Sequence, residues 1–471
     1  MNRSLEVCFN GHSFFDFPQG LIMSDFHQPG VIADLHRLHE TLDSESYLLG
    51  LEGELEEYAR KVRMALVLPV HISEFRGGKA LPKIVAEISK VRYLHQILIA
   101  LGGVERLRDF QAAKDYFGRL RAAAGDVKVI WVDGPRIQSV FRSLQDQKMS
   151  IGASGKGQSV WIALGYLFAQ NDCEWVALHD CDVLTYDRIF LARLFHPLTN
   201  PFGHFQFCKG YYPRYSSRER VMQGRVTRLF VIPFLDAMKT VVERCGGNHH
   251  LHQFFTFFSA FKYPLAGEVS LAADLAKSLE FSSDWGLEVA MISQVYHHLK
   301  PRQVAQVALT CNYDHKHQDL SPDDSAKGLH KMVLNIASFF SHFLASHDIV
   351  IDETFRALLC REYAKSAARF IDFYYADAAI NSLFYDRFQE ESTVRRFQGF
   401  LQNGWGKDAG PFQTGLLPSW KNVTSTIPHI QNELVKAVTD DNFLPKYFRK
   451  RQDQIPTTNH PNTIYFHNGK T

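Results

Sequence analysis

The chain has 471 residues, of which 45% are hydrophobic and 22% are charged, so it can bury a full-sized core and is not globally disordered. Its net charge of +2 provides no broad basic surface, which argues against nucleic acid as a partner. The apolar stretches are too short or too interrupted by charge to span a bilayer, and the N-terminus lacks the pattern of a secretory signal.

The seven cysteines are scattered along the chain, and no two of them form a Cys-x-x-Cys pair. An odd number at this spacing favours free thiols in a reducing compartment over a disulfide framework or a zinc site. We therefore expect a cytoplasmic protein.

Residues 1–60 are expected to form an N-terminal extension that is helical in part, because Ile32, Leu35, Leu38 and Leu42 recur at helical spacing. Alternating strands and helices follow, which predicts a mostly parallel sheet with helices on both faces. The expected strands are residues 64–70, 95–101, 129–132 and 175–178, and the expected helices are residues 80–91, 105–123 and 157–170.

The alternation becomes less regular after residue 182. Further strands are expected at residues 204–209 and 304–310, further helices at 226–244 and 272–277, and mostly helical structure from about residue 325. The predicted domains are the extension, an α/β domain over residues 61–325 with halves 61–182 and 183–325, a helical region over 326–455, and a tail over 456–471.

The most informative motif is Asp180-Cys181-Asp182, which follows the apolar run 175–178 after a single residue. A buried parallel strand that ends in two carboxylates brings both to the carboxyl edge of a sheet, where ligands bind. Two carboxylates there can hold a divalent cation, and the cation can hold a diphosphate. Asp-x-Asp is also common in ordinary loops, so the assignment depends on further motifs.

Lys156 lies between two glycines at the start of an expected helix, where its ammonium and the backbone N–H groups can meet an anion. Gln158 stands where a Walker A loop requires lysine, so that motif is excluded. The alternative is a helix N-terminus with a solvated lysine.

Gly224, Arg225 and Thr227 open another expected helix and combine backbone donors, a guanidinium and a hydroxyl, which suits an anionic ligand. The alternative is a capped amphipathic helix with exposed arginines.

Glu268 and Glu288 each lie within two residues of a glycine and can bind sugar hydroxyls or act as a base. His315 and His317 follow the last expected strand, and one imidazole there can complete a metal shell. Each feature alone is more simply a turn or a surface side chain.

Taken in order, these motifs resemble the retaining GT-A glucosyl-3-phosphoglycerate synthases. The order is Gly-Lys-Gly, a helix, Asp-x-Asp, Tyr-Tyr-x-Arg, Gly-Arg-Val-Thr, Pro-Leu-Ala-Gly-Glu, aromatic-Gly-apolar-Glu and a histidine, within residues 24–325. The resemblance implies an α/β GT-A fold, with a Rossmann-like sheet and a helical C-terminal extension. It also implies metal-dependent transfer of glucose from UDP-glucose or another nucleotide sugar to 3-phosphoglycerate, on a glucosylglycerate (compatible solute) pathway.

The resemblance further implies a role for each motif. The nucleotide sugar would be bound by Pro69, Val70, Glu74, Lys156 and Asp180. Mg²⁺ or Mn²⁺ would be bound by Asp180, Asp182 and His315, and the acceptor by Gly224, Arg225, Thr227 and His317. The catalytic residues would be Lys156, Asp182, Glu288 and Leu265, the last through its backbone carbonyl.

Three positions depart from the family pattern. Residues 68–74 lack the usual Pro-x-x-Asn-Glu, residues 101–103 lack an Asp-x-Gly-Ser turn, and His317 stands where asparagine is common.

Three alternatives remain open. The first is mannosyl or glucosyl transfer to glycerate or another small acceptor, and the second is a non-catalytic protein that binds nucleotide sugars. The third is a nucleotidyltransferase, for which Arg76-Gly77-Gly78-Lys79 is a weak indication. The expected partners are a nucleotide sugar, a small phosphorylated acceptor and a second copy of the chain in a homodimer.

Overall fold

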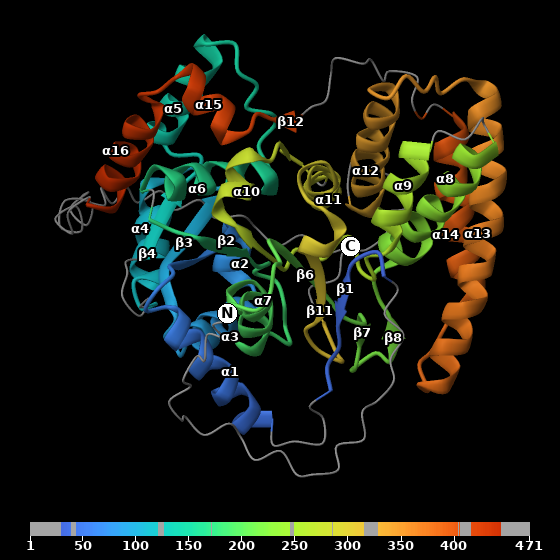
Figure 1. Cartoon of the computed structure of the whole chain (residues 1–471), viewed down its shortest axis with the longest axis horizontal. Coiled ribbons are helices and arrows are strands. Elements are labelled where there is room, and N and C mark those ends of the chain that lie inside the picture. The colour runs from blue at the N-terminus through green and yellow to red at the C-terminus, as the bar shows by residue number, and fades with distance from the viewer. Residues whose placement is uncertain are drawn as a thin grey trace, which may run out of the picture.

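The computed structural model describes residues 30–38, 44–120, 127–170, 172–244, 249–284, 286–314, 328–403, 405 and 416–443. At its centre lies an eight-stranded sheet in the order β1-β11-β6-β9-β5-β2-β3-β4 (Figure 1). Every neighbouring pair is parallel except the two pairs that contain β9. The prediction of a mostly parallel sheet flanked by helices is therefore confirmed.

The strands of this sheet are β1 (Ala33–Leu35), β2 (Met64–His71), β3 (Leu94–Gly102), β4 (Val127–Trp131), β5 (Trp175–Leu178), β6 (Phe207–Tyr211), β9 (Val269–Ala272) and β11 (Val304–Ala308). Two short antiparallel ribbons accompany it: β7 (Tyr215–Ser216) with β8 (Val221–Met222), and β10 (Phe281–Ser282) with β12 (Leu416–Leu417).

The helices of the α/β part are α1 (Ser44–Tyr58), α2 (Ile72–Gly77), α3 (Leu81–Ile88), α4 (Leu107–Phe117), α5 (Pro135–Asp146), α6 (Lys156–Gln170), α7 (Ile189–Thr199), α10 (Ala273–Ser278), α11 (Leu287–His298) and the 3₁₀ turn η2 (Pro301–Gln303). The remaining helices are the π-helix η1 (Val226–Val231), α8 (Ile232–Arg244), α9 (His249–Ser259), α12 (Gly328–Ala345), α13 (Glu353–Ile380), α14 (Arg387–Asn403), α15 (Trp420–Thr426) and α16 (Ile430–Asn442).

The central strands are apolar at almost every position because both faces of the sheet are covered. Along β2, Ala65 and Val67 enter one hydrophobic core, whereas Met64, Leu66 and Leu68 enter the other. Successive side chains of a strand point to opposite faces, so a strand between two helical layers needs apolar residues on both. This accounts for the uninterrupted apolar runs in the sequence.

The order in which the strands are added to the sheet reverses beside β2. Strands β3 and β4 follow on one side of it, and β5 then pairs with its other side. Val67 is in register with Leu178, so Pro69 and Asp180 leave the two strands at the same edge. Such a switch point is where open α/β sheets form a ligand crevice.

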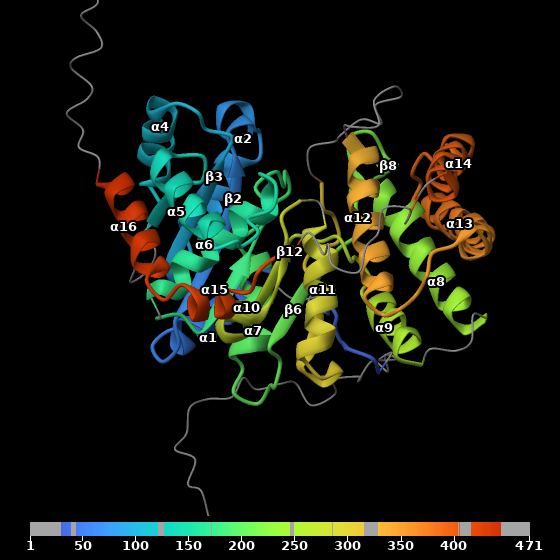
Figure 2. The same cartoon turned by 90° about the horizontal axis from the view of Figure 1, so that it is seen from above.

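Helices α8, α9, α12, α13 and α14 form a bundle beside the sheet (Figure 2). The last helices leave this bundle: α15 packs against α10, and α16 packs against α5, α6 and β4. The helical C-terminal region expected from the sequence therefore contacts two separate parts of the molecule. The domain boundaries themselves stay a prediction.

One expectation for the N-terminal extension is wrong in part. The helical spacing that begins at Ile32 and Leu35 does not give a helix there, because Ala33–Leu35 is the edge strand β1, parallel to β11. Pairing with an open sheet edge outweighs a periodicity of so few residues. Helix α1 follows at Ser44 and accounts for the helical part. Within the described ranges, no helix combines the length and apolarity needed to cross a membrane.

Candidate active site

Three charged side chains meet at the carboxyl edge of β2 and β5. Lys156 Nζ lies 2.6 Å from Asp180 Oδ1 and 2.7 Å from Glu288 Oε1. Lys156 opens α6, Asp180 follows β5, and Glu288 lies in the first turn of α11. Burial disfavours the ammonium, but the two carboxylates outweigh burial and raise the pKa of Lys156. The lysine is therefore a fixed positive charge between two negative ones.

The same three side chains line a small cavity with Pro69 from the end of β2. The backbone of residues 266–267 closes one wall, and a Cβ atom at Gly267 would overlap the Asp180 carboxylate. Only glycine permits that approach. The remaining lining residues are Val160, Leu178, His179, Ala266, Val269, Leu287 and Met291.

Asp182 is the second carboxylate of the motif. Burial, and then the negative charge of Asp180, raise the pKa of Asp182 to about 7, although Lys156 and Arg214 oppose the shift. Two carboxylates that resist ionising together are stabilised by a divalent cation, and oxygen ligands suit Mg²⁺ or Mn²⁺. The carboxylates of Asp180 and Asp182 therefore suit the expected Mg²⁺ or Mn²⁺ ion.

The third expected metal ligand, His315, lies outside the described residues, as does His317. Among the residues that are described, no group of three or more His, Cys, Asp or Glu side chains is arranged to hold a metal ion. Asp180 and Asp182 are thus the part of the proposed ligand set that can be placed.

Glu268 supports the site from within the protein. It is fully buried and accepts hydrogen bonds from Tyr212 and Tyr313, both at 2.6 Å. The two tyrosine rings stack with centroids 3.6 Å apart and an interplanar angle of 1°. The sequence indicated Glu268 as a sugar-binding or basic residue, but nothing in the sequence indicated these buried partners.

Lys209 is a residue that the sequence did not indicate. It is buried in β6, and its ammonium donates to the carbonyl of Ala266, which lines the cavity. Burial lowers the pKa of Lys209 to about 8, although Glu288 and Glu268 oppose the shift. The signal that the sequence offered was a lysine at the end of the expected strand 204–209.

The predicted acceptor residues lie at the start of η1 and separate into two neighbouring cavities. Thr227 lines a cavity of about 560 Å³ together with Tyr212, Arg214 and Lys262. Arg225 instead lines a cavity of about 360 Å³. Its guanidinium binds Gln389 at 2.6 Å and Glu390 at 3.2 Å.

Arg228, Met222 and Gln223 line both of these cavities and so form the wall between them. Gly224 precedes the helix, and its carbonyl accepts from the Arg228 N–H at 2.9 Å. The structure thus brings Thr227 to the cavity beside Tyr212, whereas Arg225 is directed toward α14.

Val70, Glu74 and Leu265 do not line the small cavity at Lys156. Val70 is buried in the core, and Glu74 lies in the first turn of α2. Leu265 is half-buried and directly precedes Ala266, which does line the cavity.

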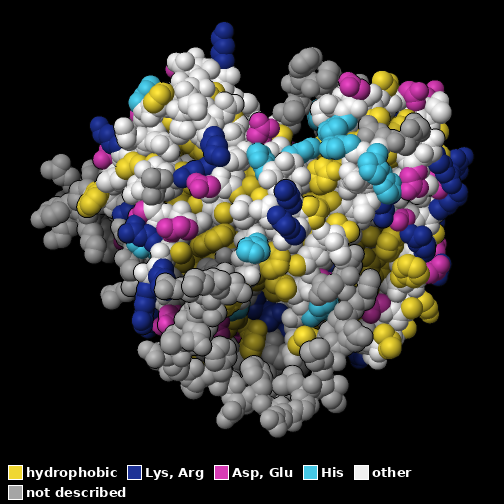
Figure 3. Space-filling view, in the orientation of Figure 1, with side chains coloured by type: hydrophobic (Ala, Val, Ile, Leu, Met, Phe, Trp, Pro, Cys, Tyr) yellow, Lys and Arg dark blue, Asp and Glu magenta, His cyan; other side chains and the backbone are white. Residues whose placement is uncertain are grey.

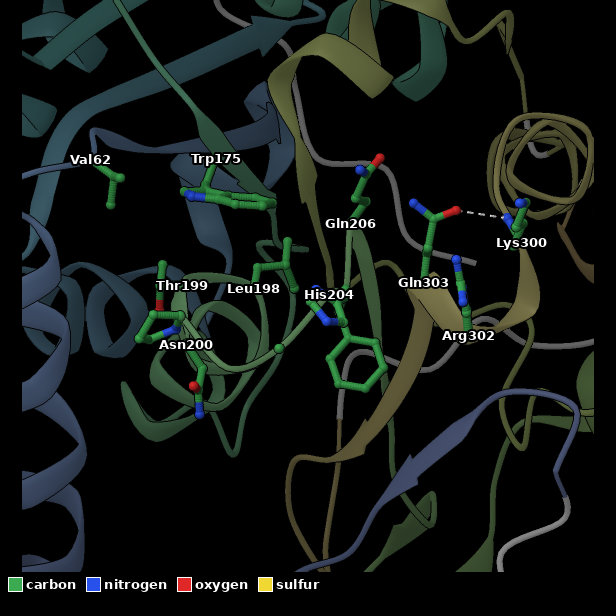
Figure 4. A pocket seen from close by; sticks show the side chains of 13 residues that line it. Val62, Trp175, Leu198, Thr199, Asn200, His204, Gln206, Lys300, Arg302 and Gln303 are labelled. Atoms are coloured by element: carbon green, nitrogen blue, oxygen red, sulfur yellow. Dashed lines mark hydrogen bonds between the residues drawn. The ribbon is translucent and has the colours of Figure 1, made fainter. Parts of the chain in front are cut away.

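A larger cavity of about 700 Å³ lies at the opposite edge of the sheet, at the amino ends of the parallel strands (Figure 4). It contains Trp175 from the start of β5 and Gln206 just before β6, with Lys300 and Arg302 opposite. None of the residues predicted from the motifs lines it, so cavity size alone does not identify the site.

No protein-family model matches this chain. The chain is 36% identical to the glucosyl-3-phosphoglycerate synthase of Persephonella marina over 421 residues, which cover 89% of this chain and 99% of the relative. It is 32% identical to the synthase of the same name from Methanococcoides burtonii over 379 residues, covering 80% and 90% of the two chains.

Among solved structures, the chain resembles the glucosyl-3-phosphoglycerate synthase of Mycobacterium tuberculosis in complex with Mn²⁺, UDP-glucose and phosphoglyceric acid. That likeness has a TM-score of 0.46 and 18% identity, and it covers 68% of this chain and 88% of the other. The sequence match to the Persephonella protein, which extends over nearly its whole length, decides the assignment. This chain belongs to the glucosyl-3-phosphoglycerate synthase family.

Proposed function

We propose that this protein transfers glucose from a nucleotide sugar, with UDP-glucose as the expected donor, to 3-phosphoglycerate with retention of anomeric configuration. One observation carries the proposal: in a chain of this family, Lys156, Asp180 and Glu288 meet at the switch point of the sheet. The relatives from Persephonella and Methanococcoides both bear the name of this reaction.

The donor would bind at the carboxyl edge of β2 and β5, with its diphosphate and sugar next to Lys156, Asp180 and Glu288. Asp180 and Asp182 would hold Mg²⁺ or Mn²⁺, which supplies positive charge where the diphosphate departs. Lys156 presents a second positive charge that its two carboxylate partners hold in place. Glu288 is placed to accept hydrogen bonds from the sugar hydroxyls, which orients the anomeric carbon.

The acceptor would bind in the cavity that Thr227 lines. The charged lining residues there are Arg214, Arg228, Lys262 and Asp377, so positive charge predominates, as a phosphate and a carboxylate require. Arg214 also lowers the pKa of Asp182 against the effects of burial and Asp180, so its charge acts on the donor side as well. An acceptor held by Arg214 would thus lie next to the donor.

Retention is expected without a carboxylate nucleophile. Asp180 and Glu288, the two carboxylates that line the small cavity, each bind Lys156, which reduces their nucleophilicity. The bond between the anomeric carbon and the diphosphate oxygen breaks, and the diphosphate leaves with the electron pair. The acceptor hydroxyl attacks the same face and gives its proton to the departing phosphate oxygen.

A donor–acceptor screen with and without Mg²⁺ tests the proposal. UDP-glucose with 3-phosphoglycerate should give a phosphorylated glucoside that phosphatase converts to glucosylglycerate, and chelation of the metal should abolish the reaction. A preference for glycerate, or for GDP-mannose, would replace the proposed acceptor or donor. Transfer that survives in Asp182→Ala with normal metal dependence would show that the metal assignment is wrong.

A homodimer is part of the proposal. Large apolar side chains are exposed on α13, on the loop after it and on α14, namely Phe373, Tyr375, Ile380, Phe384 and Phe388. Exposed large apolar side chains are candidates for a protein–protein interface. Light scattering should give the mass of two chains, and Phe384→Glu together with Phe388→Glu should give the mass of one.

A cytoplasmic location is also part of the proposal. The described cysteines Cys173, Cys181, Cys208, Cys311 and Cys360 all have free thiols. Free thiols are what a reducing compartment maintains. Fractionation of the source cells, with an antibody to the protein, tests this.

A further inference from the structure

The last described segment, residues 416–443, returns from the helical bundle to the side of the sheet where α5, α6 and β4 lie (Figures 1 and 2). It contains β12, α15 and α16, and we call it the C-terminal strap. None of its residues lines the small cavity at Lys156 or the cavities at η1. Among the elements that it contacts is α6, the helix that begins with Lys156.

Two tryptophans join the strap to α6. The rings of Trp161 and Trp420 stack with centroids 4.6 Å apart, and both side chains are buried. Trp161 Nε1 donates to the carbonyl of Pro418, and Trp420 Nε1 donates to the carbonyl of Trp161, both at 2.8 Å. One turn further along α6, a Cβ atom at Gly165 would overlap the Trp420 ring. The indole therefore lies directly on the backbone of α6.

The far end of the strap is anchored on the edge strand β4. The side chain of Asn442 accepts from the Val129 N–H at 3.2 Å and donates to the Val129 carbonyl at 2.8 Å. These are the bonds that a neighbouring strand would make to an open sheet edge. Arg136 binds the buried Asp441 at 2.5 Å and ties α16 to α5 as well.

The near end of the strap reaches the loop before Lys156. Leu416 and Leu417 of β12 pair with β10, and Ser283 directly follows β10. The Ser283 hydroxyl accepts from the Ala153 N–H at 3.1 Å, and its carbonyl accepts from the Gln158 N–H at 3.3 Å. Through β10 and Ser283, the strap is therefore linked to residues on both sides of Lys156, and it also contacts the body of α6.

We propose that the C-terminal strap positions Lys156, with Trp420 as its principal positioning residue. Trp420 holds α6 at Trp161 and Gly165, and β12 supports the loop over residues 153–158 through β10 and Ser283, so that Nζ lies between Asp180 and Glu288. Trp420 touches no substrate and acts only through Lys156. The role of this positioning in catalysis rests on the proposed function. The contacts between the strap and α6 do not depend on it.

A ligand-free experiment tests the geometry first. Hydrogen exchange of the amides of residues 152–160 should accelerate about tenfold in Trp420→Ala, because the loop and the first turn of α6 lose their anchor. Trp405→Ala is the matched control. Trp405 is also buried, its Nε1 donates to the Ala337 carbonyl at 2.6 Å, and it packs against Phe234 in the helical bundle. Equal exchange of residues 152–160 in the two variants would overturn the proposal.

A double-mutant cycle tests the link to Lys156, using UDP affinity measured by calorimetry with Mn²⁺. Trp420→Phe keeps an aromatic ring and is the variant for use if Trp420→Ala does not fold. It should weaken UDP binding about threefold to tenfold in the parent, equivalent to roughly 0.6–1.4 kcal/mol, and have no further effect in Lys156→Met. Additive losses would mean that Trp420 does not act through Lys156. If the parent protein does not bind UDP, the proposed function fails, and the exchange experiment alone decides the role of the strap.

Discussion

Two ion clusters, one at the sheet edge and one at the helical bundle, have opposite composition. In the first, Lys156 lies between Asp180 and Glu288, at 2.6 and 2.7 Å. In the second, Glu390 lies between Arg225 and Arg228, at 3.2 and 2.7 Å. One cation between two carboxylates leaves a net charge of −1, and one carboxylate between two guanidinium groups leaves +1.

The sign of this imbalance indicates what each region is suited to bind. The sheet-edge cluster, with Asp182 beside it, has negative charge that a divalent cation would offset. The bundle cluster has positive charge that an anion would offset. We therefore expect a cation to bind more readily at the sheet-edge cluster and an anion at the bundle cluster.

The largest effect is expected at the sheet edge. Asp180→Asn removes one carboxylate of the motif and one of the two partners of Lys156, so glucosyl transfer should fall about 10³-fold or more. Steady-state assays with UDP-glucose and 3-phosphoglycerate measure this. Asp274→Asn, whose side chain is 90% exposed, is the control and should keep its activity. A loss smaller than tenfold in Asp180→Asn would separate this cluster from the chemistry.

The bundle cluster should matter first for stability. Glu390→Gln leaves two guanidinium groups without their shared carboxylate and should lower the free energy of unfolding by about 3 kcal/mol. Arg225 is partly exposed, which places the loss at the lower end of the range for buried pairs. Urea unfolding measures it, and Glu391→Gln on the next residue, with a more exposed surface pair, should cost about 1 kcal/mol or less. Equal losses would show that the first cluster has no special role in holding α14.

The third prediction asks which arginine, Arg214 or Arg225, binds 3-phosphoglycerate. Arg214→Gln should raise the KM for 3-phosphoglycerate about tenfold, because Arg214 lines the same cavity as Thr227. Arg225→Gln should raise that KM less, since its guanidinium is bound to Gln389 and Glu390. The reverse order would support the acceptor role that the family resemblance implies for Arg225.

The smallest effect is expected from a third cluster, which consists of histidines. Protonated histidine rings repel each other, so acid should lower the stability of the fold. Histidines gather on the face in Figure 3 over α9, α11 and α12. The rings of His250, His297 and His347 lie 5.6–6.2 Å apart. Burial, and then His347 and His250, lower the pKa of His297, so the folded state favours the neutral ring.

The stability that depends on neutral His297 is therefore present above the unfolded pKa of about 6.5 and is lost as the pH falls toward the lower folded value. The melting temperature should drop between pH 7 and pH 5, and less so in His297→Gln. An equal drop in both proteins would assign the acid sensitivity to other groups.

The sequence alone determined the strands that lead to the site and the motifs at their ends. Strands β2 and β5 are apolar at nearly every position, and the motif that begins at Asp180 follows β5 after a single residue. These signals are local, because a strand buried on both faces must be apolar and a parallel strand must deliver its next residues to one edge. The family resemblance and its fold followed from the order of such local signals.

Only the tertiary structure decided which distant side chains share a contact. Trp161 and Trp420 are 259 residues apart, and the strap that joins them has no periodicity that indicates its partner. Likewise, Arg225 and Thr227 are neighbours in one motif, yet packing against α14 directs Arg225 away from the cavity that Thr227 lines. Apolar burial and ion pairing depend on which surfaces meet after folding, and local spacing along the chain does not contain that information.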